Sequence, residues 1–267
     1  MIYKFDDKNH LHTLNGKALT GTSSIGNVLA KPLTWWASGL AVSKLGWIKK
    51  TDTRKATKEE VALNAEARKE SAELWREKIW TMTPEDYLNL LDEAYKAHSV
   101  KLKDSAKTGT DLHQEIEDFV KGRMGLKAVR EYDIKIKPFI DWSDENVVEF
   151  KWSEAHCFDE EMFIGGISDV GAILKDGKLA VIDIKSSKEA YPAQFLQCAG
   201  YAIQIEKNGL WDMGGTVNKM LEQPVEALII VPFGADKIEP AIRYDVESYK
   251  QGFRSAVVLY RLLGLEK

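Results

Sequence analysis

Apolar residues repeat with two different periods along the chain. Up to about residue 142 most of them fall three or four residues apart, as in helices, whereas from residue 147 they alternate or run together, as in strands. Leaving aside a short helix at 133–142, the order expected after residue 109 is helix, three strands, helix, two strands and helix, which predicts an α/β fold with a mixed sheet between helices. The expected helices are 57–81, 84–100, 109–120, 133–142, 191–207 and 246–263, and the expected strands are 147–152, 163–174, 179–184, 225–231 and 238–244.

The first 45 residues combine a small hairpin with a helix that follows a run of hydroxyl side chains. Apolar residues at 2–5 and 12–14 flank a polar turn, which predicts the hairpin. Thr22, Ser23 and Ser24 then precede an apolar periodic stretch at 28–45. Such hydroxyls cap the N-terminus of a helix, which is the favoured interpretation, or they hold a phosphate there.

The turn of the hairpin that begins near residue 163 decides which acidic side chains meet. A two-residue turn would leave Asp169 and Asp183 on opposite faces of the sheet, whereas a three-residue loop that ends at a left-handed Gly177 places them opposite each other. Their Cβ atoms would then be about 4.5–5.5 Å apart. Lys185 follows on the same face, because side chains alternate with period two. We predict the three-residue loop.

Two carboxylates at that separation repel each other unless a divalent cation lies between them. Magnesium and manganese ions take such hard oxygen ligands, and Lys185 would stand beside a metal-bound water or a scissile phosphate oxygen. The alternative interpretation is an exposed hairpin whose acids and lysine are solvated, with one salt bridge across the strands.

The helices before and after the hairpin carry polar side chains that could serve this site. His113 flanks the apolar stripe of the earlier helix, and Glu117 lies one turn further on. The plainer interpretation is a partly buried histidine paired with that carboxylate. In the later helix Gln194, Gln197 and Tyr201 share one face. Amide and phenol groups can hydrogen-bond a phosphate without adding charge.

Composition narrows the class of protein. A chain of 267 residues with 44% hydrophobic and 29% charged residues is ordinary for a globular protein that buries one substantial core. A net charge of −4 argues against a protein that coats polyanions, although a local basic groove remains compatible with it. Two cysteines are too few for a disulfide framework, a four-cysteine zinc site or an iron–sulfur cluster, and they fit a reducing cytosol. We expect no membrane partner, because no apolar run is long enough to span a bilayer.

Four sequence elements together resemble the RecB-type branch of the PD-(D/E)xK nuclease superfamily. They are Gly-Thr-Asp-Leu-His at 109–113, Gly-Gly-Ile-Ser-Asp at 165–169, Asp-Ile-Lys at 183–185 and a Gln-x-x-x-Tyr motif at 197–201. The opening of the chain, including Lys-Pro-Leu-Thr-Trp-Trp at 31–36, resembles more loosely the phage recombination exonucleases of that superfamily. The resemblance implies a restriction-endonuclease-like core, in which helices flank a mixed central sheet, with a mainly helical N-terminal region. We expect residues 1–108 to form that region, packed on a nuclease core of residues 109–267 in one compact domain.

The resemblance also implies roles for individual residues. Asp169 and Asp183 would bind magnesium or manganese, with the main-chain carbonyl of Ile184 and the imidazole of His113 as further ligands, and Lys185 would assist the attacking water.

A second group of residues would lie around the metal site and along the nucleic acid. Gln197 and Tyr201 would position the DNA backbone, and Glu154 matches an acid that is frequent in the family. Further candidates are Gln194 and Ser186 for DNA contact, Thr22, Ser23 and Ser24 for phosphate contact, and Glu117 as an additional acid.

By this resemblance the protein is expected to be a metal-dependent deoxyribonuclease, an exonuclease that processes DNA ends in recombination or repair, of phage type. The alternatives are a catalytically inactive DNA-binding or assembly module of the same fold, and a structure-specific endonuclease. The expected partners are linear duplex ends or single strands of DNA and a single-strand annealing or recombination protein, and a homo-oligomer is possible. The expected location is the bacterial or phage-infected host cytosol.

Overall fold

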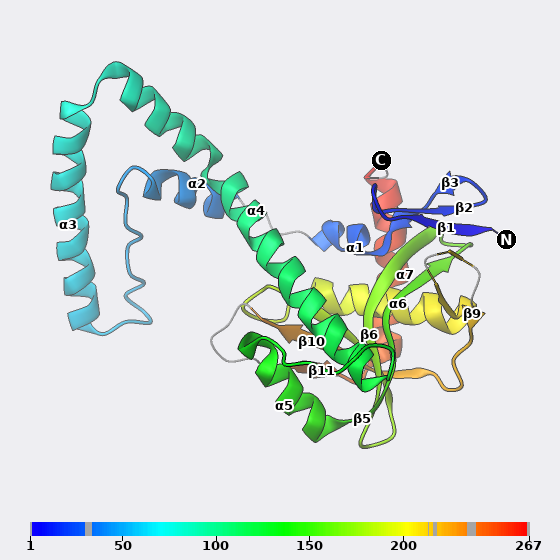
Figure 1. Cartoon of the computed structure of the whole chain (residues 1–267). Coiled ribbons are helices and arrows are strands. Elements are labelled where there is room, and N and C mark those ends of the chain that lie inside the picture. The colour runs from blue at the N-terminus through cyan, green and yellow to red at the C-terminus, as the bar shows by residue number, and fades with distance from the viewer. Residues whose placement is uncertain (1, 30–33, 213, 216–217, 234–238, 266–267) are drawn as a thin grey trace. The chain divides into compact units, whose positions relative to one another are not determined.

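The computed structural model describes residues 2–29, 34–212, 214–215, 218–233 and 239–265, and it divides into two compact units. The sheet unit contains residues 1–30 and 108–267, and the helical unit contains residues 31–107. Helix α4 (Pro84–Arg123) contributes residues to both, and each unit is described by itself (Figure 1). The sequence-based division into residues 1–108 and 109–267 stays a prediction.

The sheet unit is built on an eight-stranded mixed sheet. Its strand order is β11-β10-β7-β6-β5-β8-β9, with β4 beside β6. Strands β5, β6 and β7 are antiparallel neighbours, whereas β10 runs parallel to β7. The strands are β4 (Thr20–Gly21), β5 (Val147–Asp159), β6 (Ile164–Leu174), β7 (Leu179–Lys185), β8 (Leu210–Trp211), β9 (Asn218–Lys219), β10 (Val225–Pro232) and β11 (Ala241–Arg243).

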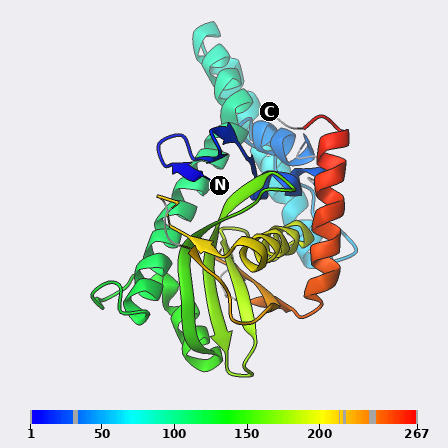
Figure 2. The same ribbon diagram turned by 90° about the vertical axis from the view of Figure 1, so that its right-hand side faces the viewer.

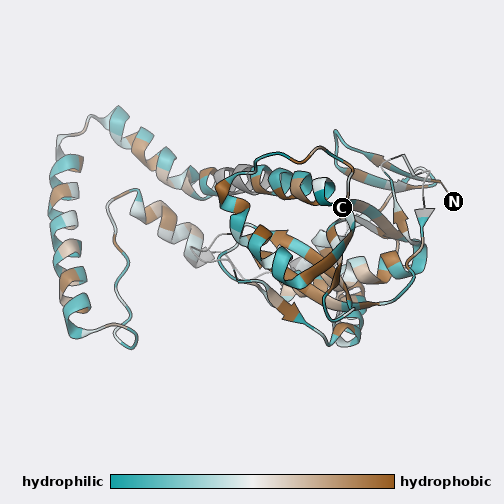
Figure 3. Ribbon diagram, turned by 60° about the horizontal axis from the view of Figure 1, so that its bottom comes forward, coloured by the Kyte–Doolittle hydropathy of each residue, from teal (hydrophilic) through white to brown (hydrophobic). Residues whose placement is uncertain are grey.

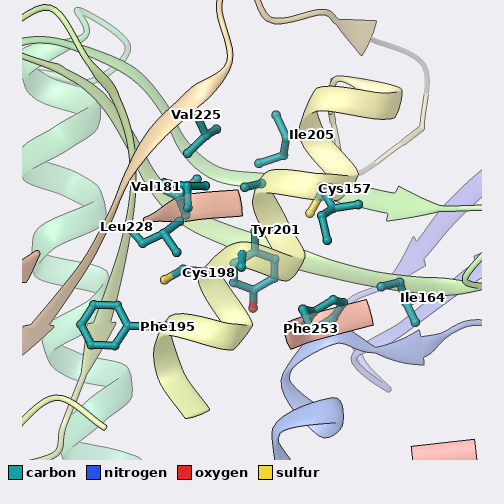
Figure 4. Packing of buried hydrophobic residues seen from close by; sticks show 14 of the residues in the cluster. Cys157, Ile164, Val181, Phe195, Cys198, Tyr201, Ile205, Val225, Leu228 and Phe253 are labelled. Atoms are coloured by element: carbon teal, nitrogen blue, oxygen red, sulfur yellow. The ribbon is translucent and has the colours of Figure 1, made fainter. Parts of the chain in front are cut away.

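Helices cover both faces of this sheet, as predicted. Helices α6 (Pro192–Asn208) and α7 (Val246–Leu262) enclose one core, to which Phe195 of α6, Phe253 of α7 and Val181 of β7 all belong (Figures 2 and 4). The C-terminal part of α4, a short 3-10 helix (Ile134–Ile136) and α5 (Lys137–Asn146) enclose the other, which receives Ala180 and Ile182 of the same strand. Strand β7 therefore reads as a continuous apolar run because both of its faces are buried. The chain is a mixed α/β protein.

The predicted hairpin and its register are confirmed in strands β6 and β7. The amide of Leu174 donates to the carbonyl of Lys178 (2.9 Å), and Gly177 closes the three-residue loop with a left-handed φ of +85°. The strand pairing continues through Val170 opposite Ile182. Turn length therefore sets which faces the acidic side chains of this hairpin occupy.

Other predicted elements agree with the structure to within a few residues. The helices predicted at 57–81, 191–207 and 246–263 correspond to α3 (Lys58–Thr81), α6 and α7, and the helix predicted at 133–142 corresponds to the 3-10 helix and α5. The strand predicted at 225–231 is β10. The strand predicted at 238–244 is the shorter β11, and residue 238 lies outside the described residues.

Three predicted boundaries were wrong. The helices expected at 84–100 and 109–120 are one helix, α4, because no proline separates them and the intervening residues favour a helix. The strand expected to end at residue 152 continues in β5 to Asp159, where it pairs with the start of β6. Of the helix expected at 28–45, the structure shows the end of a 3-10 helix (Gly26–Leu29) and α2 (Thr34–Ser43), and a separate short helix, α1 (Thr22–Ile25), precedes them. Residues 30–33, with part of the 31–36 motif, lie outside the described residues.

The predicted N-terminal hairpin is present as a three-stranded sheet of β1 (Tyr3–Asp6), β2 (Leu11–Leu14) and β3 (Lys17–Ala18). A buried network ties it to β5. The hydroxyl of Tyr3 lies 2.6 Å from Nδ1 of His12 and 3.2 Å from Nδ1 of His156. Burial, with the nearby imidazoles of His156 and His10, lowers the pKa of His12 to about 3. His12 is therefore neutral in the folded protein at neutral pH.

This buried imidazole makes stability depend on pH. In the unfolded chain His12 has a pKa of about 6.5. Between about pH 6.5 and 3 the unfolded chain therefore binds a proton at His12, whereas the folded chain does not. We expect His12 to lower the free energy of unfolding over that window as pH falls, by at most about 1.4 kcal/mol per pH unit. His12→Asn keeps an acceptor for Tyr3 and removes the titration. Urea denaturation at pH 7 and at pH 4.5 should show a smaller loss of unfolding free energy for the variant than for wild type. Equal losses for the two proteins would contradict the expectation.

The helical unit contains α2, α3 and the N-terminal part of α4. Helix α3 begins with the predicted capping box, in which the Thr57 side chain accepts from the amide of Glu60 and the Glu60 carboxylate accepts from the amide of Thr57. None of the described residues of α3 is buried, and polar and apolar residues alternate along it (Figure 3). Among the described residues, no helix of the chain is long and apolar enough to cross a membrane.

Candidate metal centre

The register of three neighbouring strands places three acidic side chains side by side. Val170 and Ile182 form the backbone pair of this hairpin that lies farthest from its turn. Asp169 and Asp183 come one residue beyond that pair, so the same register sets them opposite each other. On the other side, Ser153 pairs with Val170 and Ala155 with Ser168, which sets Glu154 of β5 opposite Asp169. Asp169 thus lies between the other two carboxyl groups.

Asp169 is held at the centre of this group by contacts from two elements. Its Oδ2 accepts a hydrogen bond of 2.8 Å from the amide of Ile184, the residue that follows Asp183. The same oxygen lies 3.7 Å from Nδ1 of His113, which α4 contributes. His113 is half-buried, as the apolar stripe of α4 packs on the sheet through Ile116 and Phe119.

His113, Glu154 and Asp169 form a donor set that suits a divalent cation. One potential ligand atom from each lies within 4.8 Å of the others. Two carboxylate oxygens fit the hard cations magnesium and manganese, and the imidazole nitrogen favours manganese of the two. The residues that the structure brings together therefore fit the metal expected from the sequence.

Glu154 has an unusual backbone and an unusual acidity for a strand residue. Its φ of +52° lies in the left-handed region, which costs about 1–3 kcal/mol for a residue with a side chain and persists where the surroundings impose it. Burial, together with the negative charges of Asp169 and Glu117, raises the pKa of its carboxyl group to about 8. A cation that binds here displaces a proton from Glu154 at neutral pH.

Asp183 is fully buried and contacts two other polar groups. Its Oδ2 lies 2.7 Å from Nζ of Lys185, and its Oδ1 accepts a hydrogen bond of 3.4 Å from Gln197. Burial raises the pKa of Asp183, and Lys185 opposes the rise. Burial lowers the pKa of Lys185, but the charges of Asp183 and Asp169 outweigh it and hold that pKa above its ordinary value. The lysine is therefore a cation at neutral pH. Metal ligation by Asp183 stays a prediction, as does ligation by the Ile184 carbonyl.

Gln197 and Tyr201 of α6 lie next to these carboxylates. The Gln197 amide donates to the Tyr201 hydroxyl (2.7 Å), and both side chains line the same pocket as Asp169. Gln194, one turn earlier, is engaged elsewhere, because its Oε1 accepts from the amide of Tyr191 and its Nε2 donates to the Ser187 hydroxyl. Ser186 is exposed just beyond the end of β7. DNA contact by Gln194 and Ser186 stays a prediction.

A pocket of about 740 Å³ joins these side chains to the N-terminal residues. His113, Glu154 and Asp169 line it together with Thr22, Ser23 and Ser24 of α1, which the sequence had suggested as phosphate contacts. Sequence reasoning missed several other residues that line the pocket, because they come from distant elements that share no motif. They are Asn9, His10, Leu11, His12 and Leu19 from the N-terminal sheet and its turns, and Tyr260 from α7.

The prediction that these hydroxyls cap a helix was wrong. Helix α1 begins at Thr22 itself, and its N-cap, Gly21, makes no side-chain hydrogen bond. Gly21 pairs with Gly165 as the end of β4, so the strand continues until the helix starts. The Thr22 hydroxyl instead accepts a 2.8 Å hydrogen bond from the buried Gln204 of α6.

Glu117 lies near Glu154 but is not part of the candidate donor set of His113, Glu154 and Asp169. Its carboxylate contacts Nζ of Lys121 and accepts a 3.1 Å hydrogen bond from Gln114, both on α4. The alternative interpretation, in which His113 pairs with Glu117, is therefore not the contact that the structure shows, because His113 faces Asp169.

Gly166 allows α1 and α6 to approach β6 at this pocket. A Cβ atom there would lie 2.7 Å from a ring carbon of Tyr201 and 2.8 Å from the Thr22 hydroxyl. We expect Gly166→Ala to lower the free energy of unfolding by about 1–3 kcal/mol, because the surroundings are too close-packed to yield. Gly26→Ala is the matched control, since its Cβ would meet atoms only at 3.8 Å. Equal denaturant midpoints for the two variants would contradict the packing argument.

Comparison with known proteins adds no relative: no protein-family model matches the chain, and neither does any curated protein.

Proposed function

We propose that this protein is a metal-dependent deoxyribonuclease of the PD-(D/E)xK type, which hydrolyses phosphodiester bonds as an exonuclease at DNA ends. The observation that carries the proposal is the convergence of His113, Glu154 and Asp169 beside the ion pair of Asp183 and Lys185. Buried ion pairs are costly to maintain, so one beside a candidate metal site suggests a chemical use rather than a contribution to stability alone.

The order of elements supports the same core. The C-terminal part of α4, the antiparallel strands β5, β6 and β7, then α6 and a β10 that runs parallel to β7 follow the arrangement that the sequence resemblance implies. The four motif regions lie on α4, β6, β7 and α6.

Each side chain of the site has a chemical role in hydrolysis. A divalent cation held by His113, Glu154 and Asp169 would neutralise phosphate charge and make a bound water more acidic. Lys185 carries its proton at neutral pH, so it serves as a charge-assisted donor to an oxygen on which negative charge develops, and not as a general base. The Gln197 amide and the Tyr201 hydroxyl are placed to orient a phosphate by hydrogen bonds.

The walls of the pocket favour the end of a strand over its middle. The N-terminal sheet, α1 and Tyr260 of α7 bound the pocket in addition to the metal-binding residues. We rest the exonuclease part of the proposal on these additional walls together with the sequence resemblance.

Digestion of labelled DNA tests the proposal. Linear duplex and single-stranded DNA, labelled at the 5′ or 3′ end, and covalently closed circular duplex are incubated with magnesium or manganese, and with EDTA as control. We expect metal-dependent release of nucleotides from linear DNA and no cut in closed circles. Cleavage of closed circles would indicate an endonuclease instead. Binding of DNA without hydrolysis in either metal would indicate the inactive module and overturn the proposal.

A further inference from the structure

A short stretch of the helical unit is strongly basic. Residues 44–58, which we call the basic segment, contain six lysine or arginine residues and a single acid, Asp52. Their formal charge is +5, whereas that of the whole chain is −4. All six basic residues are exposed, namely Lys44, Lys49, Lys50, Arg54, Lys55 and Lys58.

The backbone of this segment is fixed along α3 by side chains of that helix. The Ser71 hydroxyl donates to the carbonyl of Gly46 (2.7 Å), and the guanidinium of Arg68 donates to the carbonyl of Ile48. These two main-chain carbonyl groups, near the start of the segment, are thus bound to the helix.

Asn64 completes this set of contacts. Its side-chain amide donates to the carbonyl of Lys49 (3.2 Å), and its Oδ1 accepts from the amide of Thr51 (3.1 Å). These bonds use the backbone of the segment and leave its lysine side chains pointing elsewhere. The segment is therefore an ordered strip of chain that presents lysines to solvent.

The acidic residues of α3 lie away from this strip. Asn64, Arg68 and Ser71 are spaced by four and three residues, so they form one stripe of the helix. At about 100° per residue, five glutamates fall on the far side of α3 from that stripe. They are Glu59, Glu66, Glu70, Glu73 and Glu77. Glu60, which lies nearer the stripe, is occupied in the capping box with Thr57.

The lysines of the segment are not neutralised locally. Arg54 pairs with Asp52 (2.9 Å), but Lys49, Lys50 and Lys55 form no ion pair with any residue that the structure describes. Trp47 lies beside them with about two-fifths of its surface exposed. Exposed lysines outside ion pairs, on an ordered segment beside an aromatic ring, have the chemistry that binds a polyanion with stackable bases.

We propose that the basic segment is a docking surface for the phosphodiester backbone of DNA, separate from the pocket of the sheet unit. The choice of DNA as the polyanion rests on the proposed function. The surface reads no sequence, because lysine–phosphate contacts position a nucleic acid without identifying its bases. It adds affinity for the substrate through residues that do not line that pocket.

Fluorescence anisotropy of a labelled DNA duplex and its single strand, in EDTA so that nothing is cleaved, tests this proposal. The triple variant Lys49→Gln/Lys50→Gln/Lys55→Gln should bind at least about tenfold more weakly than wild type at moderate salt. Its slope of log affinity against log salt should be shallower by about 2–3 for the duplex, as expected for three lost phosphate contacts.

A matched control removes the same charge from elsewhere in the helical unit. Lys69→Gln/Arg76→Gln/Lys96→Gln changes three exposed residues of α3 and α4 that lie outside the basic segment. We expect it to keep wild-type affinity and salt slope, and both triple variants to keep the wild-type melting temperature, since exposed substitutions change stability little.

The outcomes separate this proposal from the proposed function. Equal affinities and slopes for the two triple variants would overturn the docking surface, even if the wild type digests DNA with magnesium. Selective loss of binding in the basic-segment variant would support it, even if the wild type hydrolyses nothing, and in that case the nuclease proposal alone would fall.

Discussion

Asp169→Asn is expected to abolish metal-dependent cleavage, with metal affinity at least about a hundredfold lower than in wild type. Substitution of a residue that only supports a metal ligand typically lowers metal affinity or activity by about 10–100-fold. Asp169 is a direct member of the donor set with His113 and Glu154, so a larger loss is expected. The fold should survive, because the side-chain oxygen of an asparagine at this position can still accept the hydrogen bond that Asp169 now accepts from the amide of Ile184.

Titration calorimetry with manganese, alongside cleavage of linear DNA, measures this effect. In metal-free buffer Asp169→Asn should melt at a higher temperature than wild type, because it relieves repulsion with the neighbouring carboxyl groups of Glu154 and Asp183. Asp141→Asn, an exposed acid of α5 paired with Lys137, is the control and should bind manganese as wild type does. Unchanged manganese affinity in Asp169→Asn would remove the proposed metal centre.

Lys185→Ala is expected to lower the cleavage rate by about 10²–10³ while the protein still binds metal and DNA. The lysine is a cation paired with Asp183, the neighbour of Asp169 in the sheet, and can act on charge that develops in the transition state. Removing it leaves Asp183 buried without its partner, and the raised pKa of that carboxyl group lets it take up a proton instead of remaining an unpaired charge.

Single-turnover cleavage of end-labelled DNA measures the rate without the binding step. Lys185→Met keeps the apolar stem of the side chain, so it separates a chemical effect from a packing effect. Its cleavage rate should fall as much as that of Lys185→Ala. Lys188→Ala, an exposed lysine three residues further on, should cleave as wild type does. A folded Lys185→Met protein with wild-type cleavage would exclude Lys185 from the reaction.

Local rules were sufficient to predict the hairpin at the centre of the site. The three-residue loop that ends at Gly177 sets the register of β6 and β7, and register with period-two alternation is enough to bring Asp169 opposite Asp183. The capping box likewise predicts the start of α3 at Thr57. The Thr57 hydroxyl accepts a hydrogen bond from the amide of Glu60, and the Glu60 carboxylate accepts one from the amide of Thr57.

The parts that sequence reasoning missed depend on contacts between distant residues. Nothing in the local sequence of Glu154 indicates that its backbone turns left-handed and faces Asp169, because that follows from the pairing of β5 with β6. The walls that His10 and Tyr260 give to the pocket come from opposite ends of the chain. Gly109 favours a break between two helices in the sequence, but α4 runs through it, since a single glycine within a long helix costs only about 1 kcal/mol.

Anomalous diffraction from crystals grown with manganese tests the central claim most directly, since it locates the ion without reference to any reaction. We expect a manganese peak within direct coordination distance of His113, Glu154 and Asp169, which is lost in crystals of Asp169→Asn. A wild-type crystal saturated with manganese that shows no peak among these three side chains would contradict the metal centre on which the proposed nuclease depends.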